Sequence, residues 1–303
     1  LVAIMGLVHL QRAGHHPVAL VGGGTGMIGD PSGKASERQL LTVEEIDANT
    51  AAIRAQLARF LDFSGDRAAR MVDNGEWLRD LKAIEFMRDV GKHFTVNLMM
   101  QKDSVKSRMD SGISYTEFSY MLLQAYDFLE LRRRYGVSLQ IGGSDQWGNI
   151  TAGTELIRRT LQQEAHGVTL PLVTTASGHK FGKSEVGAVW LDATRTSPYK
   201  FFQFWVNTDD ADALKYLKMF TLMDHGDIDA LTAAHLEAPH ERAAQRRLAA
   251  AVTSIVHGAA AAGHAEQVSH VVFDKRTDAR ALSAGDYAML AAEIPHAVTH
   301  GGG

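Results

Sequence analysis

The order of apolar and polar residues predicts helices alternating with short buried strands in the first part of the chain. Residues 1–13 have helical character, and residues 18–21 form a fully apolar, partly β-branched run. Residues 42–60 are predicted to be a second helix, because apolar side chains recur there at spacings of seven, four and three. Residues 138–141 and 170–175 are predicted to be further strands. This alternation predicts a parallel sheet in an α/β layer fold.

After Pro198 the apolar spacing becomes helical throughout. Asn207 and Thr208 are predicted to cap a helix that carries three aspartates in its first turn. The alanine-rich run 259–262 is more typical of a helix segment or connector than of a functional tract. The last third of the chain is therefore predicted to be a helical domain.

Composition narrows the class of protein. Of 303 residues, 45% are hydrophobic and 22% charged, so the chain can form a core. The absence of cysteine excludes disulfides, thiolate metal sites and cysteine nucleophiles, and is compatible with the cytoplasm, where we expect the protein. A net charge of −4 argues against indiscriminate polyanion binding, and no apolar run is long enough for a membrane span.

A glycine-rich turn follows the first predicted strand. Residues 24–29 fit the G-x-G-x-x-G dinucleotide pattern, but that pattern must open a helix, and Pro31 interrupts one almost at once. Residues 32–34 resemble part of a P-loop, yet Ala35 replaces the magnesium-binding Ser or Thr. The remaining interpretation is a backbone left bare for close ligand approach, with Asp30 as a lone carboxylate. A simple tight turn is the alternative.

A polar stripe marks the helix predicted around residues 116–128. Tyr120, Gln124 and Asp127 stand at i, i+4 and i+7, so they share one helical face. Their flanks are Met, Leu, Ala and Phe. The stripe therefore faces water or lines a pocket, and the apolar flanks favour the pocket.

Two later segments have the same strand-then-turn character. Residues 139–149 form a strand, a glycine turn and a helix start, where Asp145 either binds ribose hydroxyls or caps the helix. In residues 177–184, Lys180 and Lys183 could bring ammonium groups to phosphate, although two loop lysines are commonly just solvated.

Taken together, in this order and spacing, these four segments resemble tyrosyl-tRNA synthetases of the bacterial type, which are class I aminoacyl-tRNA synthetases. Residues 180–184, Lys-Phe-Gly-Lys-Ser, look like the Lys-Met-Ser-Lys-Ser signature of that class. The resemblance covers almost the whole chain. It implies a Rossmann-like, nucleotide-binding catalytic domain over residues 1–194, with a dimer-forming helical insertion, and an α-helical domain over residues 195–303.

The resemblance also implies site residues. Asp30, Tyr120 and Gln124 would hold the α-ammonium group of tyrosine with help from Asn74, and Asp127 would accept the phenol hydrogen bond. The full tyrosine set would be Asp30, Asn74, Tyr120, Gln124, Asp127 and Gln140. The ATP set would be Gly142 and Asp145 at the ribose, with Gln146, Lys180 and Lys183. Mobile loops that close on the pyrophosphate would carry the catalytic set, Lys34, Arg38, Lys180, Lys183 and Ser184.

The chemistry of the implied reaction suits these residue types. A carboxylate attacks the α-phosphorus of ATP, and because this nucleophile is already an anion, no general base is needed. Cationic side chains on loops neutralise the developing charge. Magnesium is expected with the ATP, held chiefly by phosphate, and no protein metal site is predicted. A buried Asp127 left unpaired would disfavour phenylalanine, and enzymes of this type reject phenylalanine about 10⁵-fold without editing.

Two departures from the family pattern leave alternatives open. The His-Ile-Gly-His signature is absent, because His9, His15 and His16 have the wrong spacing, and the chain opens without Met and closes on three glycines. We therefore expect a piece of a longer chain, with the signature upstream and a small RNA-binding domain downstream. The expected partners are L-tyrosine, ATP, tRNA(Tyr) and a second copy, bound around residues 112–124. The alternatives are an inactive tyrosine- or ATP-binding remnant and a tryptophanyl-type enzyme, against which Asp127 argues.

Overall fold

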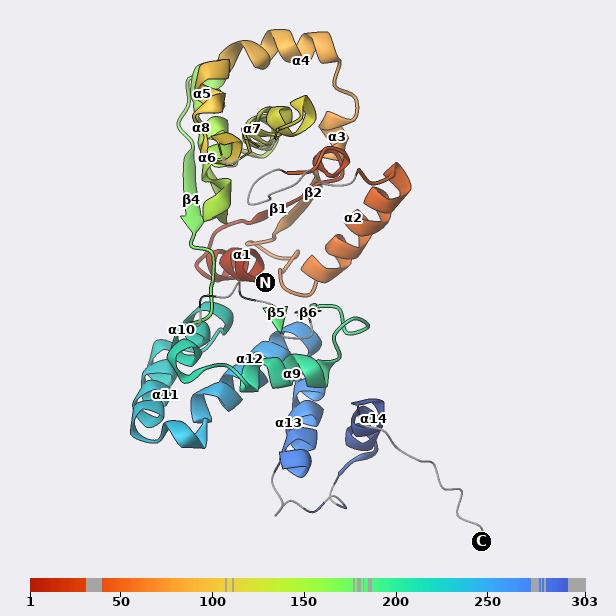
Figure 1. Cartoon of the computed structure of the whole chain (residues 1–303), viewed down its shortest axis with the longest axis vertical. Helices are drawn as coiled ribbons and strands as arrows, with labels where there is room; N and C mark the ends of the chain where they lie inside the picture. Colours follow the sequence, from red (N-terminus) through yellow and green to blue (C-terminus); the bar gives the residue numbers. More distant parts are fainter. Residues whose placement is uncertain are drawn as a thin grey trace. The chain divides into compact units, whose positions relative to one another are not determined.

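The computed structural model forms two compact units, Gly6–Leu172 and Leu1–Met5 with Val173–Gly303 (Figure 1). The residues that it describes are 1–30, 40–106, 108–110, 112–176, 178, 181, 183–184, 187–273, 278, 280 and 282–293. The boundary predicted between a catalytic domain (1–194) and a helical domain (195–303) stays a prediction. None of the described helices is long and apolar enough to cross a membrane.

The unit Gly6–Leu172 contains two pairs of parallel strands. β1 (Val18–Val21) pairs with β2 (Arg70–Asp73), and β3 (Leu139–Gly143) pairs with β4 (His166–Leu170). The helices at the start of the chain and before β3 are α1 (Val2–Arg12), α2 (Val43–Leu57), α3 (Gly75–Leu78), α4 (Ala83–Asp89), α5 (Val96–Met100), α6 (Asp103–Lys106) and α7 (Tyr115–Tyr135). α8 (Trp147–Leu161) crosses over from β3 to β4, as a parallel pair requires. The predicted α/β class is confirmed.

Local chemistry explains where these helices begin and end. The Thr42 side chain accepts a hydrogen bond from the Glu45 amide and the Glu45 carboxylate accepts one from the Thr42 amide, so a capping box starts α2. The Ser114 side chain accepts a hydrogen bond from the Glu117 amide at the start of α7, and Gly136, with a φ of 67°, ends that helix. The helix predicted over residues 42–60 is thus confirmed, although it ends at Leu57.

One strand prediction is wrong, and one strand of the structure was not predicted. The strand predicted over residues 170–175 is wrong: β4 ends at Leu170, because Pro171 has no amide hydrogen to continue the ladder. The sequence gives little sign of β2, because Arg-Met-Val-Asp is not an apolar run. Only Val72 of its four residues is buried.

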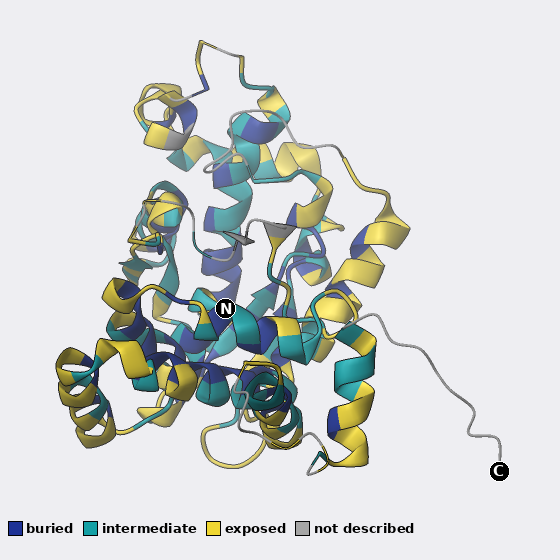
Figure 2. Ribbon diagram, turned by 60° about the horizontal axis from the view of Figure 1, so that its bottom comes forward, coloured by how far each residue is buried: buried dark blue, intermediate teal, exposed yellow. Residues whose placement is uncertain are grey.

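The core of this unit lies between α7 and α8. The buried face of α7 includes Met121, Ala125 and Phe128, and Figure 2 shows such buried positions on the inner faces of the helices. Phe128 lies so close to Gly153 of α8 that a Cβ there would stand 3.0 Å from its ring. Close packing of α7 fixes the polar stripe that the same helix carries.

The second unit is helical, as predicted, with α9 (Pro198–Val206), α10 (Asp210–Phe220), α11 (His225–Glu237), α12 (Ala243–His257), α13 (Ala259–Phe273) and α14 (Ala284–Glu293). The cap predicted at Asn207 and Thr208 is wrong: Asp209 is the N-cap of α10, and Asn207 ends α9. The ring of Phe181 stacks on Phe220 with 5.0 Å between centroids and an interplanar angle of 14°. The second residue of the Lys-Phe-Gly-Lys-Ser segment is therefore anchored in the helical core.

Candidate active site

The carboxyl ends of three strands carry the polar residues of the site. The glycine-rich turn follows β1, and Asp73 and Asn74 stand at the end of β2, in register with Val21. Asp145 and Gln146 follow β3 in a short 3-10 turn. In α/β folds, ligands bind at the carboxyl ends of parallel strands.

Asp127 is a buried carboxylate with two neutral donors. Its side chain is 2% exposed. Asn74 Nδ2 donates to Oδ2 at 2.8 Å and Trp77 Nε1 donates to Oδ1 at 2.8 Å. Burial raises the pKa of Asp127 to about 7, although these two hydrogen bonds oppose the rise. The stripe predicted on α7 is therefore not a solvent face at this end.

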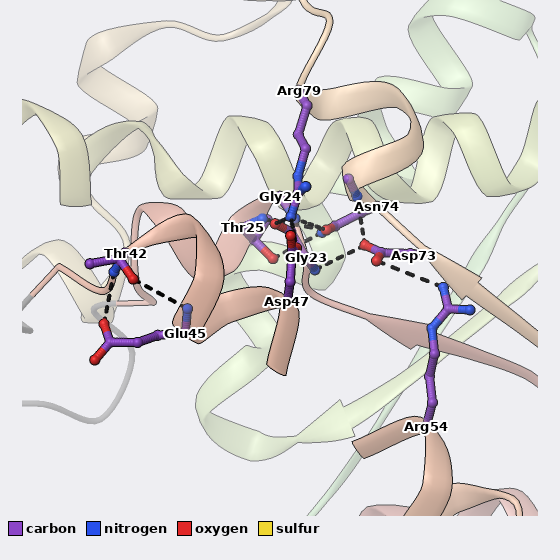
Figure 3. Close-up of polar contacts among 11 residues, drawn as sticks. Gly23, Gly24, Thr25, Thr42, Glu45, Asp47, Arg54, Asp73, Asn74 and Arg79 are labelled. Carbon is purple, nitrogen blue, oxygen red and sulfur yellow. Dashed lines mark hydrogen bonds and ion pairs between the residues drawn. The ribbon is translucent and has the colours of Figure 1, made fainter. Parts of the chain in front are cut away.

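Asn74 joins Asp127 to the glycine-rich turn, and Figure 3 shows its side of the turn. Its Oδ1 accepts hydrogen bonds from the Gly24 amide at 2.8 Å and the Thr25 amide at 3.4 Å. Its Nδ2 donates to Thr25 Oγ1 at 2.9 Å as well as to Asp127. The predicted role of Asn74 at the ammonium group stays a prediction, and the structure places its side chain between Asp127 and the turn.

The glycines of the turn make room for protein atoms. A Cβ on Gly23 would stand 2.3 Å from Asp73 Oδ1, and one on Gly24 would stand 2.8 Å from Leu78 Cβ. The amides of Gly23, Gly24 and Thr25 all donate to side chains of the same protein. The interpretation of these positions as backbone left bare for a ligand is wrong for the described part of the turn.

A second hydrogen-bonded chain brings together residues predicted from three segments. Gln146 Nε2 donates to Asp30 Oδ2 at 2.7 Å. Asn149 Nδ2 donates to Gln124 Oε1 at 2.8 Å and to Gln146 Oε1 at 3.3 Å. Asp30, Gln124 and Gln146 therefore lie in one polar cluster. Gln124 connects this cluster to α7, where it stands one helical turn before Asp127.

The other predicted residues around β3 are placed as follows. Tyr120 is half-buried on α7, on the same face as Gln124. Gln140 has a buried Oε1 that accepts no hydrogen bond within the described part of the chain. Gly142 lies against the next helix, since a Cβ there would stand 3.1 Å from Gln146 Cβ. Asp145 is exposed, and the alternative role as a helix cap is not seen, because Gln146 is the N-cap of α8.

The predicted cationic residues are the least defined. Lys34, Arg38 and Lys180 lie outside the described residues. Lys183 and Ser184, expected on an open loop, form β5 (Lys183–Ser184), which pairs antiparallel with β6 (Gly187–Ala188). Their side chains are outside what the structure describes.

Sequence reasoning missed three residues of the site, namely Thr25, Trp77 and Asn149. Each was visible only as a neighbour of a motif: Thr25 inside the glycine run, Asn149 at the end of the glycine-turn segment, and Trp77 three residues after Asn74. Trp77 is 4% exposed and resembles an ordinary core residue. Across the described chain, no group of three or more His, Asp or Glu side chains could hold a metal ion.

Comparison with known proteins identifies the family of the chain. Residues 1–274 match the family model described as tRNA synthetases class I (W and Y). The chain is 59% identical to the tyrosine–tRNA ligase of Anaeromyxobacter dehalogenans, covering 99% of this chain and 71% of that protein. It is 54% identical to the tyrosine–tRNA ligase of Bacillus caldotenax, covering 100% of this chain and 72% of that protein.

A solved structure gives the same result. The mitochondrial tyrosyl-tRNA synthetase of Aspergillus nidulans, truncated at its C-terminus, superimposes with a TM-score of 0.79 at 29% identity. The match covers 90% of this chain and 81% of that one. The chain therefore belongs to the class I tRNA synthetases, and within them to the tyrosyl-tRNA synthetases of the bacterial type.

Proposed function

We propose that this protein activates L-tyrosine with ATP to tyrosyl-adenylate and transfers the tyrosyl group to tRNA(Tyr) in the cytoplasm. The observation that carries the proposal is the buried carboxylate of Asp127. Asn74 and Trp77 each donate a hydrogen bond to it, and the partly buried polar side chains of Tyr120 and Gln124 lie on the same face of α7. Such a group suits the hydroxyl of a phenol, which presents one donor at the end of an apolar ring.

Tyrosine recognition is divided between the two polar clusters. We assign the phenol to Asp127, and the α-ammonium group to Asp30, Tyr120 and Gln124. Asp30 supplies a negative charge, and the hydrogen bond from Gln146 orients it. The buried Oε1 of Gln140 has no hydrogen-bond partner among the described residues, which supports its assignment near the reacting end of the amino acid.

ATP would lie at the carboxyl end of β3. We assign its ribose to Gly142 and the exposed carboxylate of Asp145, with Gln146 at the border of the two substrates. Lys34, Arg38, Lys180 and Lys183 would neutralise the phosphates, and the Ser184 hydroxyl would donate a hydrogen bond to them. Magnesium would arrive with ATP and neutralise further phosphate charge, held by phosphate oxygens rather than by a cluster of protein carboxylates.

The reaction needs positioning more than proton transfer. A carboxylate oxygen of tyrosine forms a bond to the α-phosphorus, and the bond from that phosphorus to the bridging oxygen breaks, so pyrophosphate leaves with its electron pair. A terminal hydroxyl of tRNA then attacks the tyrosyl carbonyl and releases AMP. Lysine side chains that engage the pyrophosphate more strongly in the transition state than in the ground state accelerate the first step.

Tyrosine binding is expected to depend on pH through Asp127. The pKa of Asp127 is raised to about 7 in the ligand-free protein, and a donated phenol hydrogen bond favours the ionised carboxylate. Below pH 7 a proton must therefore leave before tyrosine binds, so the Kd should be about tenfold weaker at pH 6 than at pH 8. Calorimetric titration at both pH values measures this. Asp127→Asn should show no such dependence, and an equal wild-type Kd at the two pH values would contradict the assignment.

The proposed transfer step has its own test. The protein is incubated with ATP, labelled tyrosine and bacterial tRNA, and acid-precipitable label is counted. We expect tyrosine, and not phenylalanine or tryptophan, to become attached to tRNA. Labelled tryptophan in the precipitate in place of tyrosine would contradict the proposal.

We also propose that the protein is a homodimer. Large apolar side chains are exposed on α4, on α5 and at the start of α7, including Ile84 at 74% and Tyr115 at 76% exposure. An exposed apolar surface of this kind is typical of an interface. The double change of Ile84 and Tyr115 to lysine should convert the dimer to a monomer in sedimentation velocity. Leu236→Lys, at an equally exposed position of the helical unit, should leave the dimer intact; a dimer that survives the double change would refute this interface.

A further inference from the structure

The end of β2 holds the glycine-rich turn through a single carboxylate (Figure 3). Asp73 Oδ1 accepts hydrogen bonds from the Gly23 amide at 3.0 Å and the Gly75 amide at 2.8 Å. Its Oδ2 lies 3.7 Å from Arg54 Nη2 of α2. The carboxylate therefore joins the turn after β1 to the start of α3.

The same glycine is also held through its carbonyl group. Arg79 Nη2 donates to the Gly23 carbonyl oxygen at 3.1 Å, and the same guanidinium pairs with Asp47 of α2 at 2.5 Å. The Gly23 residue thus has both its amide and its carbonyl bonded to charged side chains. Only glycine fits here, because a Cβ would stand 2.3 Å from Asp73 Oδ1.

The glycine-rich turn in its turn fixes the side chain of Asn74 by hydrogen bonds. Asn74 Oδ1 accepts from the next two amides, Gly24 and Thr25, and its Nδ2 donates to Asp127. Asn74 is 1% exposed, so it has no water to replace a lost partner. A shift of the turn would therefore move or free the amide that orients the Asp127 carboxylate.

We propose that Asp73 is a positioning residue for amino-acid selection: by fixing Gly23 it keeps Asn74, and through Asn74 the Asp127 carboxylate, in the orientation that accepts a phenol hydroxyl. This inference rests on the proposed function, in which Asp127 binds tyrosine. Asp73 would act through the turn and Asn74 rather than through a contact with the substrate. Its effect falls on the discrimination between tyrosine and phenylalanine, because only tyrosine uses the oriented carboxylate.

Asp73→Ala tests the proposal through the specificity ratio. The kcat/KM for tyrosine and for phenylalanine is measured by ATP–pyrophosphate exchange with the otherwise unchanged protein. We expect the tyrosine-to-phenylalanine ratio to fall about tenfold, with the phenylalanine value nearly unchanged. Asp73→Asn keeps an acceptor oxygen for both amides and should restore most of the ratio.

Two further variants separate positioning from general damage. Arg79 is exposed, and Arg79→Ala removes its hydrogen bond to the Gly23 carbonyl. This variant should lower the tyrosine-to-phenylalanine ratio about threefold. It keeps the proposal testable if Asp73→Ala does not fold. Asp62→Ala, which removes an exposed carboxylate that accepts the Ser64 amide at 2.8 Å, should leave the ratio unchanged. Thermal unfolding of each variant is recorded alongside.

The outcomes are distinct. An equal loss of activity toward both amino acids in Asp73→Ala and Arg79→Ala would mean that the hold on the turn is only structural, and the inference would be wrong. An unchanged ratio in these variants, together with a changed ratio in Asp127→Ala, would overturn the inference and leave the proposed function standing. An unchanged ratio in Asp127→Ala as well would overturn the proposed function itself.

Discussion

Asp127→Ala is expected to lower kcat/KM for tyrosine by about 10²-fold or more and to erode the preference over phenylalanine. The physical reason is the loss of a buried charged acceptor for the phenol. Asn74 and Trp77 also lose their common acceptor, so two buried donors would be left without a partner on this side. ATP–pyrophosphate exchange with each amino acid measures the ratio.

A second buried carboxylate of α7 provides the control for that experiment. Glu130 is 7% exposed and pairs with Arg133 at 3.1 Å and Arg134 at 2.8 Å. Glu130→Ala removes a buried charge from the same helix and leaves the hydrogen bonds from Asn74 and Trp77 to Asp127 in place, so it should affect stability and leave the ratio nearly unchanged. A similar ratio in wild type and Asp127→Ala would show that the phenol lies elsewhere.

Lys183→Ala should lower the rate of tyrosyl-adenylate formation by about 10²-fold or more and leave the Kd for tyrosine nearly unchanged. This split is expected for a cation that contacts the pyrophosphate mainly in the transition state. Stopped-flow measurement of adenylate formation gives the rate, and equilibrium dialysis gives the Kd.

The control for Lys183 is an exposed lysine with no proposed part in the site. Lys92→Ala should change neither quantity. If tyrosine affinity fell in parallel with the rate in Lys183→Ala, the residue would belong to a binding or folding element rather than to the catalytic set.

Much of the fold follows from local patterns, and the exceptions have a physical cause. The first strand is marked by a continuous apolar run and α7 by a polar stripe with helical spacing, and the structure has both elements. The sequence does not predict β2, because the segment Arg-Met-Val-Asp is stabilised by pairing with β1 rather than by an apolar run of its own. The strand predicted at 170–175 lies too late in the chain, because β-branched residues continue past Pro171, whereas the ladder of β4 ends at Leu170.

The site divides in the same way. Helical periodicity was enough to place Tyr120, Gln124 and Asp127 on one face. The donors to Asp127 are Asn74 and Trp77, which follow β2 about 50 positions earlier in the chain. Spacing within one segment contains no information about such a partner.

The glycines of the turn show the limit of motif reading most directly. A glycine run after a strand indicates that something approaches the backbone closely, but not what approaches. At Gly23 the neighbour is Asp73, and at Gly24 it is Leu78. The turn serves the substrate indirectly, by supporting Asn74.

The most direct test of the account is the amino-acid dependence of ATP–pyrophosphate exchange by the wild-type protein. We predict exchange that depends on tyrosine, with kcat/KM for tyrosine at least about 10⁴-fold above that for phenylalanine, and no measurable exchange with tryptophan. Comparable exchange with phenylalanine, or a preference for tryptophan, would contradict the central claim that Asp127 selects a phenol.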